Sequence, residues 1–379
     1  MHILIAALHR PTKPTGICRH AANLSRCLAD LSEVTQVTLV TGAWQHRYFE
    51  TAFGLLSPKI QIVAVDIQNR SINRNVWFLF GLPALVHQLS PDIVHLAFPL
   101  PFLRSRMPCS VVSTVHDLYP YECPENFGRI QSIFNRLFLK QCIHQSDGLA
   151  CVSKETLKRL KFFFPTIQTQ KHLEVIYNYV DFSNIVAKAP LIFDNEQKIP
   201  FFLSVAQHRK NKNLDLIIQA YSHLLQGQHL KQSTHLVLVG SSGPETESIK
   251  TLINTLDLSK HVHLLASLSD EELYWLYQNC EVYLTASSNE GFCLPLAEAL
   301  SLSCKVVCSD VPILREISSS QCFYFDLSGD AVANLSEMIL LAMRQTLQPL
   351  VHEDSIFSKS AIAKQYLNFY TRFNESQCP

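Results

Sequence analysis

Short, continuous apolar runs alternate with longer amphipathic stretches along the first half of the chain. The apolar runs lie at residues 3–8, 37–41, 60–65, 93–98, 111–115, 148–152 and 173–177, and the amphipathic stretches at 16–31, 76–89, 129–144 and 153–162. Runs of this kind indicate strands that are buried on both faces. The first half therefore predicts parallel strands joined by helices.

The pattern is lost between residues 182 and 198 and then resumes. Strands are predicted at 201–205, 236–239, 262–265, 282–285, 305–308 and 323–325, with helices at 214–225, 245–256, 270–279 and 295–299. Such alternation is typical of doubly wound α/β folds. We therefore predict an N-terminal Rossmann-like domain at 1–190 and a C-terminal one at 191–354. Ligands would bind in a cleft at the carboxyl ends of both sheets.

The final segment, residues 355–379, follows neither sheet pattern. Ile362, Tyr366, Phe369, Tyr370 and Phe373 have the spacing of one helix face, which predicts a helix over about 355–373. We expect this helix to cross the domain junction and to pack back against the N-terminal domain.

Charge is unevenly distributed between the two halves. Residues 1–190 hold 19 Lys and Arg against 12 Asp and Glu, a balance of +7, whereas residues 191–379 hold 13 against 20, a balance of −7. This asymmetry suggests that the first half meets an anionic partner such as a membrane surface, nucleic acid or a phosphorylated substrate, unless it is a surface bias without function. No basic stripe with interleaved aromatic residues lies on a predicted sheet face, so nucleic acid is not expected.

Other composition features point to a protein of the cytoplasm. None of the twelve cysteines forms a C-x-x-C pair, which predicts buried structural thiols rather than a metal or disulfide framework. The apolar N-terminus, residues 2–8, lacks the basic residues of a signal peptide. No stretch is long enough for a transmembrane helix, so we expect a cytoplasmic protein with, at most, peripheral contact to the inner face of the cell membrane.

The segment 287–300 carries the most specific chemistry. It follows an apolar strand, contains Gly291, and leads into a helix with Pro295 near its first position. Backbone N–H groups at such a helix start bind anions. Glu290 and Glu298 stand on either side of them, and their carboxylates suit the hydroxyl groups of a sugar. The segment therefore predicts a sugar-nucleotide site.

The spacing of Glu290 and Glu298 is E-x7-E, and with it the chain resembles the retaining GT-B glycosyltransferases of family 4, also called group 1 glycosyl transferases, over nearly its full length. The resemblance implies a GT-B fold, two Rossmann-like domains that face a central cleft. It also implies that Glu290 holds hydroxyls of the transferred sugar and that Glu298 holds the ribose. The backbone of residues 291–294, Gly291, Phe292, Cys293 and Leu294, would contact the donor. The family often has glycine at the position of Cys293, whose side chain is expected to narrow the sugar pocket.

Three further segments extend the resemblance. In the segment 204–214, Lys212 matches a lysine that clamps the donor diphosphate, while Gln207 stands at the usual arginine position, leaving Arg209 or Lys210 to supply the second charge. Such cations stabilise the negative charge of the leaving group. His116, in Val115-His116-Asp117, matches a histidine that faces the transferred hexose. Gly16 remains from a glycine-rich loop near the donor phosphate, and the segment 175–181 resembles the end of the family's first domain.

The resemblance implies a hexosyltransferase that retains configuration, with Glu290, His116 and Lys212 as its catalytic residues. The chain lacks D-x-D, the carboxylate pair of metal-dependent glycosyltransferases, so we expect no metal and no cofactor besides the nucleotide-sugar co-substrate. The His116-Asp117 pair favours GDP-mannose, with a UDP-sugar as the alternative. The expected acceptor is a glycan or lipid-linked glycan in the synthesis of cell-envelope polysaccharide or lipopolysaccharide.

Two alternatives and one surface remain open. A catalytically silent subunit with the same fold would bind glycan or a partner, and a sugar-nucleotide 2-epimerase would need no acceptor. The surface comprises the residues 129–140 and 154–165, where basic and aromatic residues mix. These helices would either contact anionic lipid or cover the sheet with a basic outer face.

Overall fold

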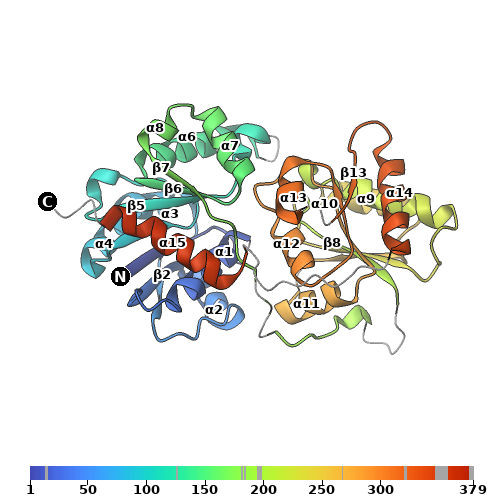
Figure 1. Ribbon diagram of the computed structural model, residues 1–379, viewed down its shortest axis with the longest axis horizontal. Coiled ribbons are helices and arrows are strands. Elements are labelled where there is room, and N and C mark those ends of the chain that lie inside the picture. Colours follow the sequence, from blue (N-terminus) through green and yellow to red (C-terminus); the bar gives the residue numbers. More distant parts are fainter. Residues whose placement is uncertain are drawn as a thin grey trace. The chain divides into compact units, whose positions relative to one another are not determined.

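The chain folds into two compact units in the computed structural model, which describes residues 1–12, 16–124, 127–180, 182, 185–193, 199–266, 268–319, 322–345 and 357–374. Unit 1 consists of Met1–Val180 and Asp354–Pro379, and unit 2 of Asp181–Glu353 (Figure 1). The junction precedes the predicted boundary at residue 190. The segment after residue 354 belongs to unit 1, although residues 346–356 lie outside the described residues.

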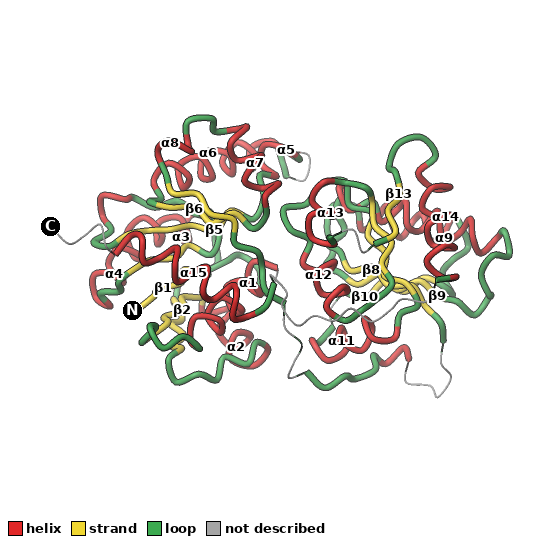
Figure 2. Tube along the Cα trace, in the orientation of Figure 1, coloured by secondary structure: helices red, strands yellow, loops and turns green. Residues whose placement is uncertain are grey.

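Unit 1 contains a parallel sheet of seven strands in the order β3-β2-β1-β4-β5-β6-β7. All seven apolar runs of the first half form these strands: β1 His2–Ala6, β2 Gln36–Gly42, β3 Ile60–Val65, β4 Ile93–Leu96, β5 Ser110–Val115, β6 Gly148–Cys151 and β7 His172–Val175. Their continuous apolar character follows from burial on both faces by helices (Figure 2).

Sequence patterning did not predict three of the helices of unit 1, α2, α5 and α8, and α3 begins five residues before the helix predicted at 76–89. The helices of this unit are α1 Gly16–Ala29, α2 Ala43–Ala52, α3 Ser71–Val76, α4 Leu82–Leu89, α5 Tyr119–Glu122, α6 Arg129–Gln145, α7 Lys154–Phe163, α8 Ile167–Gln170 and α15 Lys359–Asn374. Between α3 and α4 the backbone stays helical through a π-helical segment, η1 Trp77–Gly81. Segments of this kind often occur next to functional sites.

Unit 2 contains a parallel sheet of six strands in the order β10-β9-β8-β11-β12-β13. The strands are β8 Phe201–Val205, β9 His235–Val239, β10 Val262–Leu265, β11 Val282–Thr285, β12 Val306–Ser309 and β13 Phe323–Phe325. The helices are α9 Leu214–Gln226, α10 Thr246–Thr255, α11 Asp270–Asn279, α12 Leu294–Ser301, α13 Pro312–Ser318 and α14 Ala331–Arg344, of which α13 and α14 were not predicted. The two sheets confirm the predicted Rossmann-like, doubly wound architecture.

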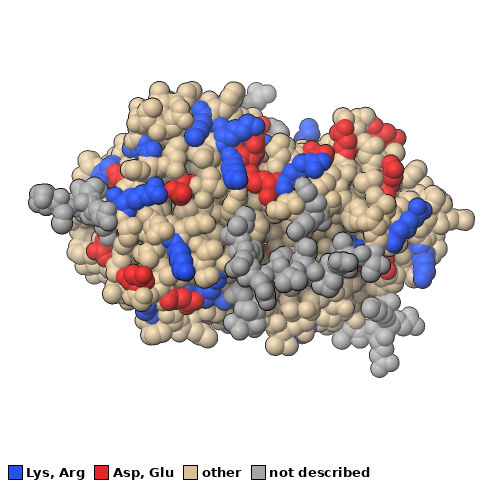
Figure 3. Space-filling view, in the orientation of Figure 1, with Lys and Arg blue, Asp and Glu red and all other residues tan. Residues whose placement is uncertain are grey.

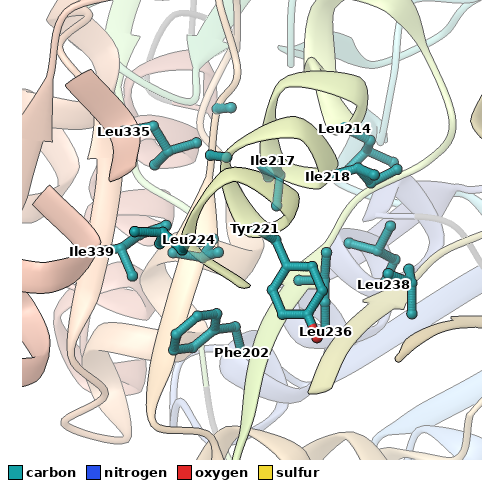
Figure 4. Close-up of a cluster of buried hydrophobic side chains, with 14 of the residues drawn as sticks. Phe202, Leu214, Ile217, Ile218, Tyr221, Leu224, Leu236, Leu238, Leu335 and Ile339 are labelled. Atoms are coloured by element: carbon teal, nitrogen blue, oxygen red, sulfur yellow. The ribbon is translucent and has the colours of Figure 1, made fainter. Parts of the chain in front are cut away.

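The core of unit 2 is built around α9, whose apolar face packs on the sheet. Leu214, Ile217, Ile218 and Leu224 of this helix are nearly fully buried (Figure 4). Tyr221 inserts among them and donates its hydroxyl proton to the carbonyl of Thr234 at 2.6 Å. A buried hydroxyl without such a partner would destabilise the core, so the tyrosine contributes both apolar area and a satisfied polar end.

Each sheet has one point at which the strand order reverses direction. In unit 1 the chain moves outward in opposite directions from β1 and β4, and in unit 2 from β8 and β11. The loops that leave the carboxyl ends of these neighbouring strands diverge to opposite faces and leave room for a ligand. The two switch points therefore position the candidate sites.

The C-terminal helix α15 is part of the core of unit 1. Its apolar stripe is buried: Ile362, Tyr366, Phe369, Tyr370 and Phe373. The hydroxyl of Tyr370 lies 2.5 Å from Nδ1 of His95 on the central strand β4, and Nε2 of His95 lies 2.7 Å from Oγ1 of Thr114 on β5. Lys359 also pairs with Asp30, just after α1, at 2.5 Å. Buried polar bonds therefore connect the last helix to the middle of the sheet.

We expect the free energy of unfolding of unit 1 to fall as the pH is lowered from about 7 to about 4. Burial lowers the pKa of His95 to about 3 from its ordinary value of 6.5. Above pH 6.5 neither state binds the proton, whereas below it the unfolded chain does and the folded unit does not. In this pH range, one such group lowers the free energy of unfolding by about 1.4 kcal/mol for each pH unit.

Urea unfolding at several pH values, in a Trp275→Phe background, tests this. The remaining tryptophans, Trp44 and Trp77, both lie in unit 1, so their fluorescence reports that unit alone. His95→Gln should flatten the pH dependence by about one proton, while His87→Gln, at an exposed position of α4, should leave it unchanged. Equal slopes for His95→Gln and the parent protein would contradict the expectation.

Candidate active site

Two loops meet at the switch point of unit 2 and are joined by asparagine side chains. The loop after β8 contains a short helix, η5 Lys210–Lys212, and the loop after β11 spans residues 286–293. Nδ2 of Asn211 donates to the carbonyl of Asn289 at 2.9 Å, and Nδ2 of Asn213 donates to that of Ala286 at 2.8 Å. The backbone amide of Ser288 returns a bond to the carbonyl of Asn211 at 2.9 Å. The two sequence motifs are therefore one structural site.

The joined loops bring Lys212 and Glu290 into an ion pair. Nζ of Lys212 donates to Oε1 of Glu290, and both side chains are largely withdrawn from solvent, with exposed fractions of 16% and 7%. The hydroxyl of Ser287 donates to the same carboxylate oxygen at 2.8 Å, and its own carbonyl accepts from Ser309. A buried charge is tolerated only when it is paired and hydrogen-bonded, so this pair is held in a defined position.

Glu298 is held by a residue that sequence reasoning missed. The hydroxyl of the buried Tyr277, near the end of α11, donates to Oε2 of Glu298 at 2.8 Å. Burial, and next the carboxylate of Glu298, raise the pKa of Tyr277 well above its ordinary value, so the hydroxyl keeps its proton and remains a donor. Nothing in the sequence near Tyr277 indicates this contact, because the two residues belong to different helices.

Cys293 adopts a backbone conformation that suits the glycine which the resemblance leads us to expect at this position. It immediately precedes α12 with φ 67° and ψ 68°, in the left-handed region. A residue with a Cβ atom pays about 1–2 kcal/mol for this conformation, whereas glycine adopts it freely. Its side chain is buried, and burial raises the pKa of the thiol. That the neighbouring amides contact the donor, and that this side chain narrows the sugar pocket, remain predictions.

A second glycine-bearing loop, residues 240–243 after β9, was also missed. A Cβ atom at Gly240 would lie 1.9 Å from the carbonyl oxygen of Ala206, and one at Gly243 would lie 2.3 Å from that of His208. The amide of His208 donates to the carbonyl of Ser241 at 3.2 Å. Only glycine permits this approach of two backbones, and the G-S-S-G sequence was the available signal.

Both candidates for the second positive charge of the predicted diphosphate clamp lie in the loop after β8. Arg209 is half-buried immediately before η5, and Lys210 is exposed in its first turn. Neighbouring His208 is buried, and its Nδ1 lies 3.0 Å from the hydroxyl of Thr246. Arg209 or Lys210 therefore stays the predicted second charge beside Lys212.

His116 follows β5 in unit 1, at a different site from the residues above. Its Nε2 donates to the carbonyl of Ala97 at 2.8 Å, which leaves Nδ1 as the acceptor of the neutral ring. Burial lowers the pKa of His116 to about 4, so the ring is neutral near pH 7. The ring of His20 packs edge-on against it at 4.7 Å and is fixed by Asn178 through a 2.7 Å contact.

His116 and Asp117 line a cavity of about 1260 Å³ at the switch point of unit 1. Oδ1 of Asp117 accepts from the amide of Tyr119 at 3.1 Å, which closes the turn after β5. Gly16 begins α1 and is exposed, but residues 13–15 of the predicted phosphate loop lie outside the described residues. The lining residues all belong to unit 1.

Three predicted absences concern the described part of the chain. Within it, no three or more His, Cys, Asp or Glu side chains are grouped so that they could hold a metal ion. The cysteines placed there form no disulfide bond. In the same residues, no helix has the length and apolar character needed to cross a bilayer.

Substitutions at Cys293 should show how much its left-handed backbone conformation strains the folded protein. We expect Cys293→Gly to change the free energy of unfolding by less than about 1 kcal/mol, since relief of strain offsets lost packing and greater freedom of the unfolded chain. Cys293→Val should lower it by about 2 kcal/mol or more, because a β-branched residue is strongly disfavoured at positive φ. Urea unfolding measures both, and equal stability of the two variants would contradict the assignment.

Comparison with known proteins extends across both units. Residues 14–184 match the family model described as Glycosyltransferase Family 4, and residues 190–322 match the one described as Glycosyl transferases group 1. The chain is 23% identical over 334 residues to an O-antigen chain mannosyltransferase, RfbU, of Salmonella typhimurium, covering 86% of this chain and 88% of that protein.

A more identical but shorter match is to a Campylobacter jejuni enzyme named N-acetylgalactosamine-N,N'-diacetylbacillosaminyl-diphospho-undecaprenol 4-alpha-N-acetylgalactosaminyltransferase. It is 34% identical over 179 residues, 47% of this chain and 46% of that protein.

Solved structures share the fold of both units. A sucrose-phosphate synthase from Thermosynechococcus elongatus has a TM-score of 0.71 at 15% identity, covering 99% of this chain and all of that one. Anabaena HepE, solved with UDP and glucose, has a TM-score of 0.61 at 16% identity over 98% of this chain and 95% of that one. At such identities the likeness shows the fold, while the two family models account for most of the sequence. The chain belongs to the family 4, or group 1, glycosyltransferases and has their GT-B fold.

Proposed function

We propose that this glycosyltransferase transfers a hexose, with mannose favoured, from a nucleotide sugar to a glycan or lipid-linked glycan of the cell envelope, with retention of configuration and without a metal ion. The observation that carries the proposal is the Lys212–Glu290 ion pair at the switch point of unit 2, together with Glu298, which lies inside α12 and is held by Tyr277. The mannosyl and O-antigen assignments of RfbU support the choice of sugar and pathway class.

The donor's diphosphate would bind at Lys212, whose ammonium group lies where the leaving group gains negative charge. Before the donor arrives, Glu290 neutralises that ammonium group. A fixed cation stabilises the transition state without the cost of reorganising solvent. Glu290, in turn, accepts hydrogen bonds from hydroxyls of the sugar, and Glu298 accepts those of the ribose while Tyr277 orients its carboxylate.

Retention follows if the acceptor hydroxyl attacks from the face that the nucleotide leaves. The departing phosphate oxygen accepts the proton of that hydroxyl, so the protein supplies position and charge rather than a nucleophile. His116 would accept a hydrogen bond from the hexose through Nδ1, because Nε2 already donates to Ala97. A histidine with a pKa of about 4 remains neutral for this role at neutral pH.

Peripheral membrane contact is part of the proposal, and it rests on α6 more than on α7. Ile133, Phe134 and Leu137 of α6 are exposed. On α7, Phe162 is also exposed, but Arg159 is engaged by Glu122 and Glu155, and Phe164 beyond the end of the helix is buried. Exposed apolar side chains between basic ones favour an interface with lipid.

Transfer assays with GDP-mannose and UDP-sugars, with EDTA present throughout, test the assignment. Glu290→Gln should lower kcat by about 10²–10³-fold, the cost of removing one preorganised polar group. Tyr277→Phe should weaken donor binding about tenfold with a smaller effect on kcat, since it removes one hydrogen bond to a charged group. Glu247→Gln, an exposed carboxylate on α10, is the matched control and should match the parent protein.

The outcomes separate the alternatives. Saturable donor binding without transfer to any acceptor, unaffected by Glu290→Gln, would favour the silent subunit. Interconversion of the nucleotide sugar in the absence of acceptor would identify an epimerase. Activity that appears only when magnesium replaces EDTA would overturn the metal-independent mechanism.

A further inference from the structure

The hydroxyl group of Tyr283 is buried in unit 2 and has no hydrogen-bond partner among the described residues. Tyr283 lies within β11, the strand that leads into the loop of Glu290, and its side chain is fully buried. An unbonded hydroxyl group in a protein interior destabilises the folded state, and phenylalanine would fill nearly the same space without that cost. The hydroxyl group therefore needs an explanation that the contacts of the described chain do not provide.

Tyr283 points to the face of the sheet on which α11 packs. Its neighbours Val282 and Leu284 belong to the apolar core around α9, and successive side chains of a strand alternate between the two faces. The ring of Tyr283 packs against the ring of Tyr277 on α11, with centroids 5.7 Å apart. The hydroxyl of Tyr277 donates to Glu298 at 2.8 Å. Two tyrosines in contact thus lie beside the motif, and the structure gives a hydrogen-bond partner to one of them.

The strong acceptors in the surroundings of the Tyr283 hydroxyl are the two motif carboxylates. Burial raises the pKa of Tyr283 well above its ordinary value, with further contributions from Cys293, Glu298 and Glu290, in that order. The hydroxyl therefore keeps its proton and is a donor. On the face of the molecule in Figure 3, Asp and Glu side chains stand at the surface, where water solvates them, whereas Glu290 and Glu298 are only 7% and 4% exposed.

Glu298 is the better partner of the two. Glu290 is held in its own loop by Lys212 and by the hydroxyl of Ser287. Glu298 is bonded to Tyr277, on which Tyr283 packs, and it acts more strongly on Tyr283 than Glu290 does. A carboxylate accepts about four hydrogen bonds, and the terminal torsion of a glutamate is soft. A turn of this carboxylate can therefore add a second tyrosine without giving up the first.

We propose that Tyr283 is a positioning residue of the donor site: when a nucleotide binds, its ribose hydroxyls turn the carboxylate of Glu298 so that it also accepts a hydrogen bond from Tyr283. The inference rests on the proposed function, which places the ribose at Glu298. The complex then gains a bond that the free protein lacks, and a ligand shifts an equilibrium only through such a difference between two states. Part of the affinity for nucleotide comes from relieving the buried hydroxyl.

Titration calorimetry of the full chain with GDP and UDP, with EDTA present throughout, tests the bond. For the nucleotide that binds, Tyr283→Phe should weaken affinity about tenfold, the usual effect of losing a hydrogen bond to a charged group. The 2′,3′-dideoxy form of the same nucleotide has no ribose hydroxyls to turn Glu298, so Tyr283→Phe should change its affinity less than twofold. In a Glu290→Gln background the tenfold effect should persist.

Urea unfolding provides a readout in the free protein. Trp275 is the tryptophan of unit 2, so its fluorescence reports that unit when Trp44→Phe and Trp77→Phe are also present. Tyr283→Phe removes a hydroxyl group that is unbonded in the free protein. The urea midpoint of this variant should therefore be no lower than that of the parent protein.

Two other buried tyrosines of unit 2 are matched controls. The hydroxyl of Tyr221 donates to the carbonyl of Thr234 in the core around α9 (Figure 4), so Tyr221→Phe should lower the urea midpoint and leave nucleotide affinity unchanged. Tyr277→Phe removes a bond to Glu298 that already exists in the free protein and should lower both. Only Tyr283→Phe should weaken binding without loss of stability, a pattern that a purely structural role does not produce.

Three results would overturn the proposal. The first is unchanged nucleotide affinity of Tyr283→Phe, with or without a lower urea midpoint; a lower midpoint would show that a buried water or another group already satisfies the hydroxyl. The second is an equal loss of affinity for the dideoxy form, and the third is loss of the effect in the Glu290→Gln background. If one nucleotide binds and Tyr283→Phe has no effect, only this inference fails. If neither GDP nor UDP binds to the parent protein, the proposed function fails as well.

Discussion

Two asparagine side chains determine the geometry on which the proposed donor site depends. Asn211 and Asn213 stand on either side of Lys212 in the chain, and both donate to backbone carbonyls of the loop that carries Glu290. Asn213 has φ 47°, in the left-handed region that asparagine tolerates better than most residues. The lysine between them is therefore directed toward the carboxylate by bonds on both sides. Lys212 and Glu290 lie on loops that leave different strands. The two asparagine bonds hold these loops together and so keep the two charged groups within contact distance.

The strands were readily predicted because parallel strands covered on both faces must be continuously apolar, and each such run has become a strand. The helices were predicted less completely. α2 begins at Ala43 directly after β2, with no intervening loop to mark its start. α14 lies beyond the last predicted strand, in a part of the chain for which no helix was predicted. The junction was placed too late because residues 185–193 have no periodic pattern of their own. Their place in unit 2 depends on distant contacts, such as the bond from the amide of Lys188 to the carbonyl of Glu271 at 3.1 Å.

The candidate site could also be predicted only where its residues lie in contiguous sequence segments. Glu290 and Glu298 were found in one contiguous segment, and Lys212 was identified through the family resemblance of a second segment. The structure brings Lys212 and Glu290 into contact. Tyr277 could not be found, because its role depends on how α11 packs beside α12. The conformation of Cys293 was equally hidden, since a cysteine in a sequence does not indicate positive φ. The arginines that line the unit 1 cavity lie in the loop after β1 and at the start of α3, and only the fold shows that they border one space with α6.

The buried link between Tyr370 and His95 affects the order in which the protein is completed during synthesis. The strands of unit 1 leave the ribosome before unit 2 does, yet the core of unit 1 needs α15, which leaves after unit 2. Unit 2 can form while the apolar faces of α1 and β4 still await their partner. Nascent unit 1 therefore presents apolar surface for most of the translation time, the condition under which chaperones bind and chains associate wrongly. Interrupted synthesis would leave an unfinished first half beside a finished second half.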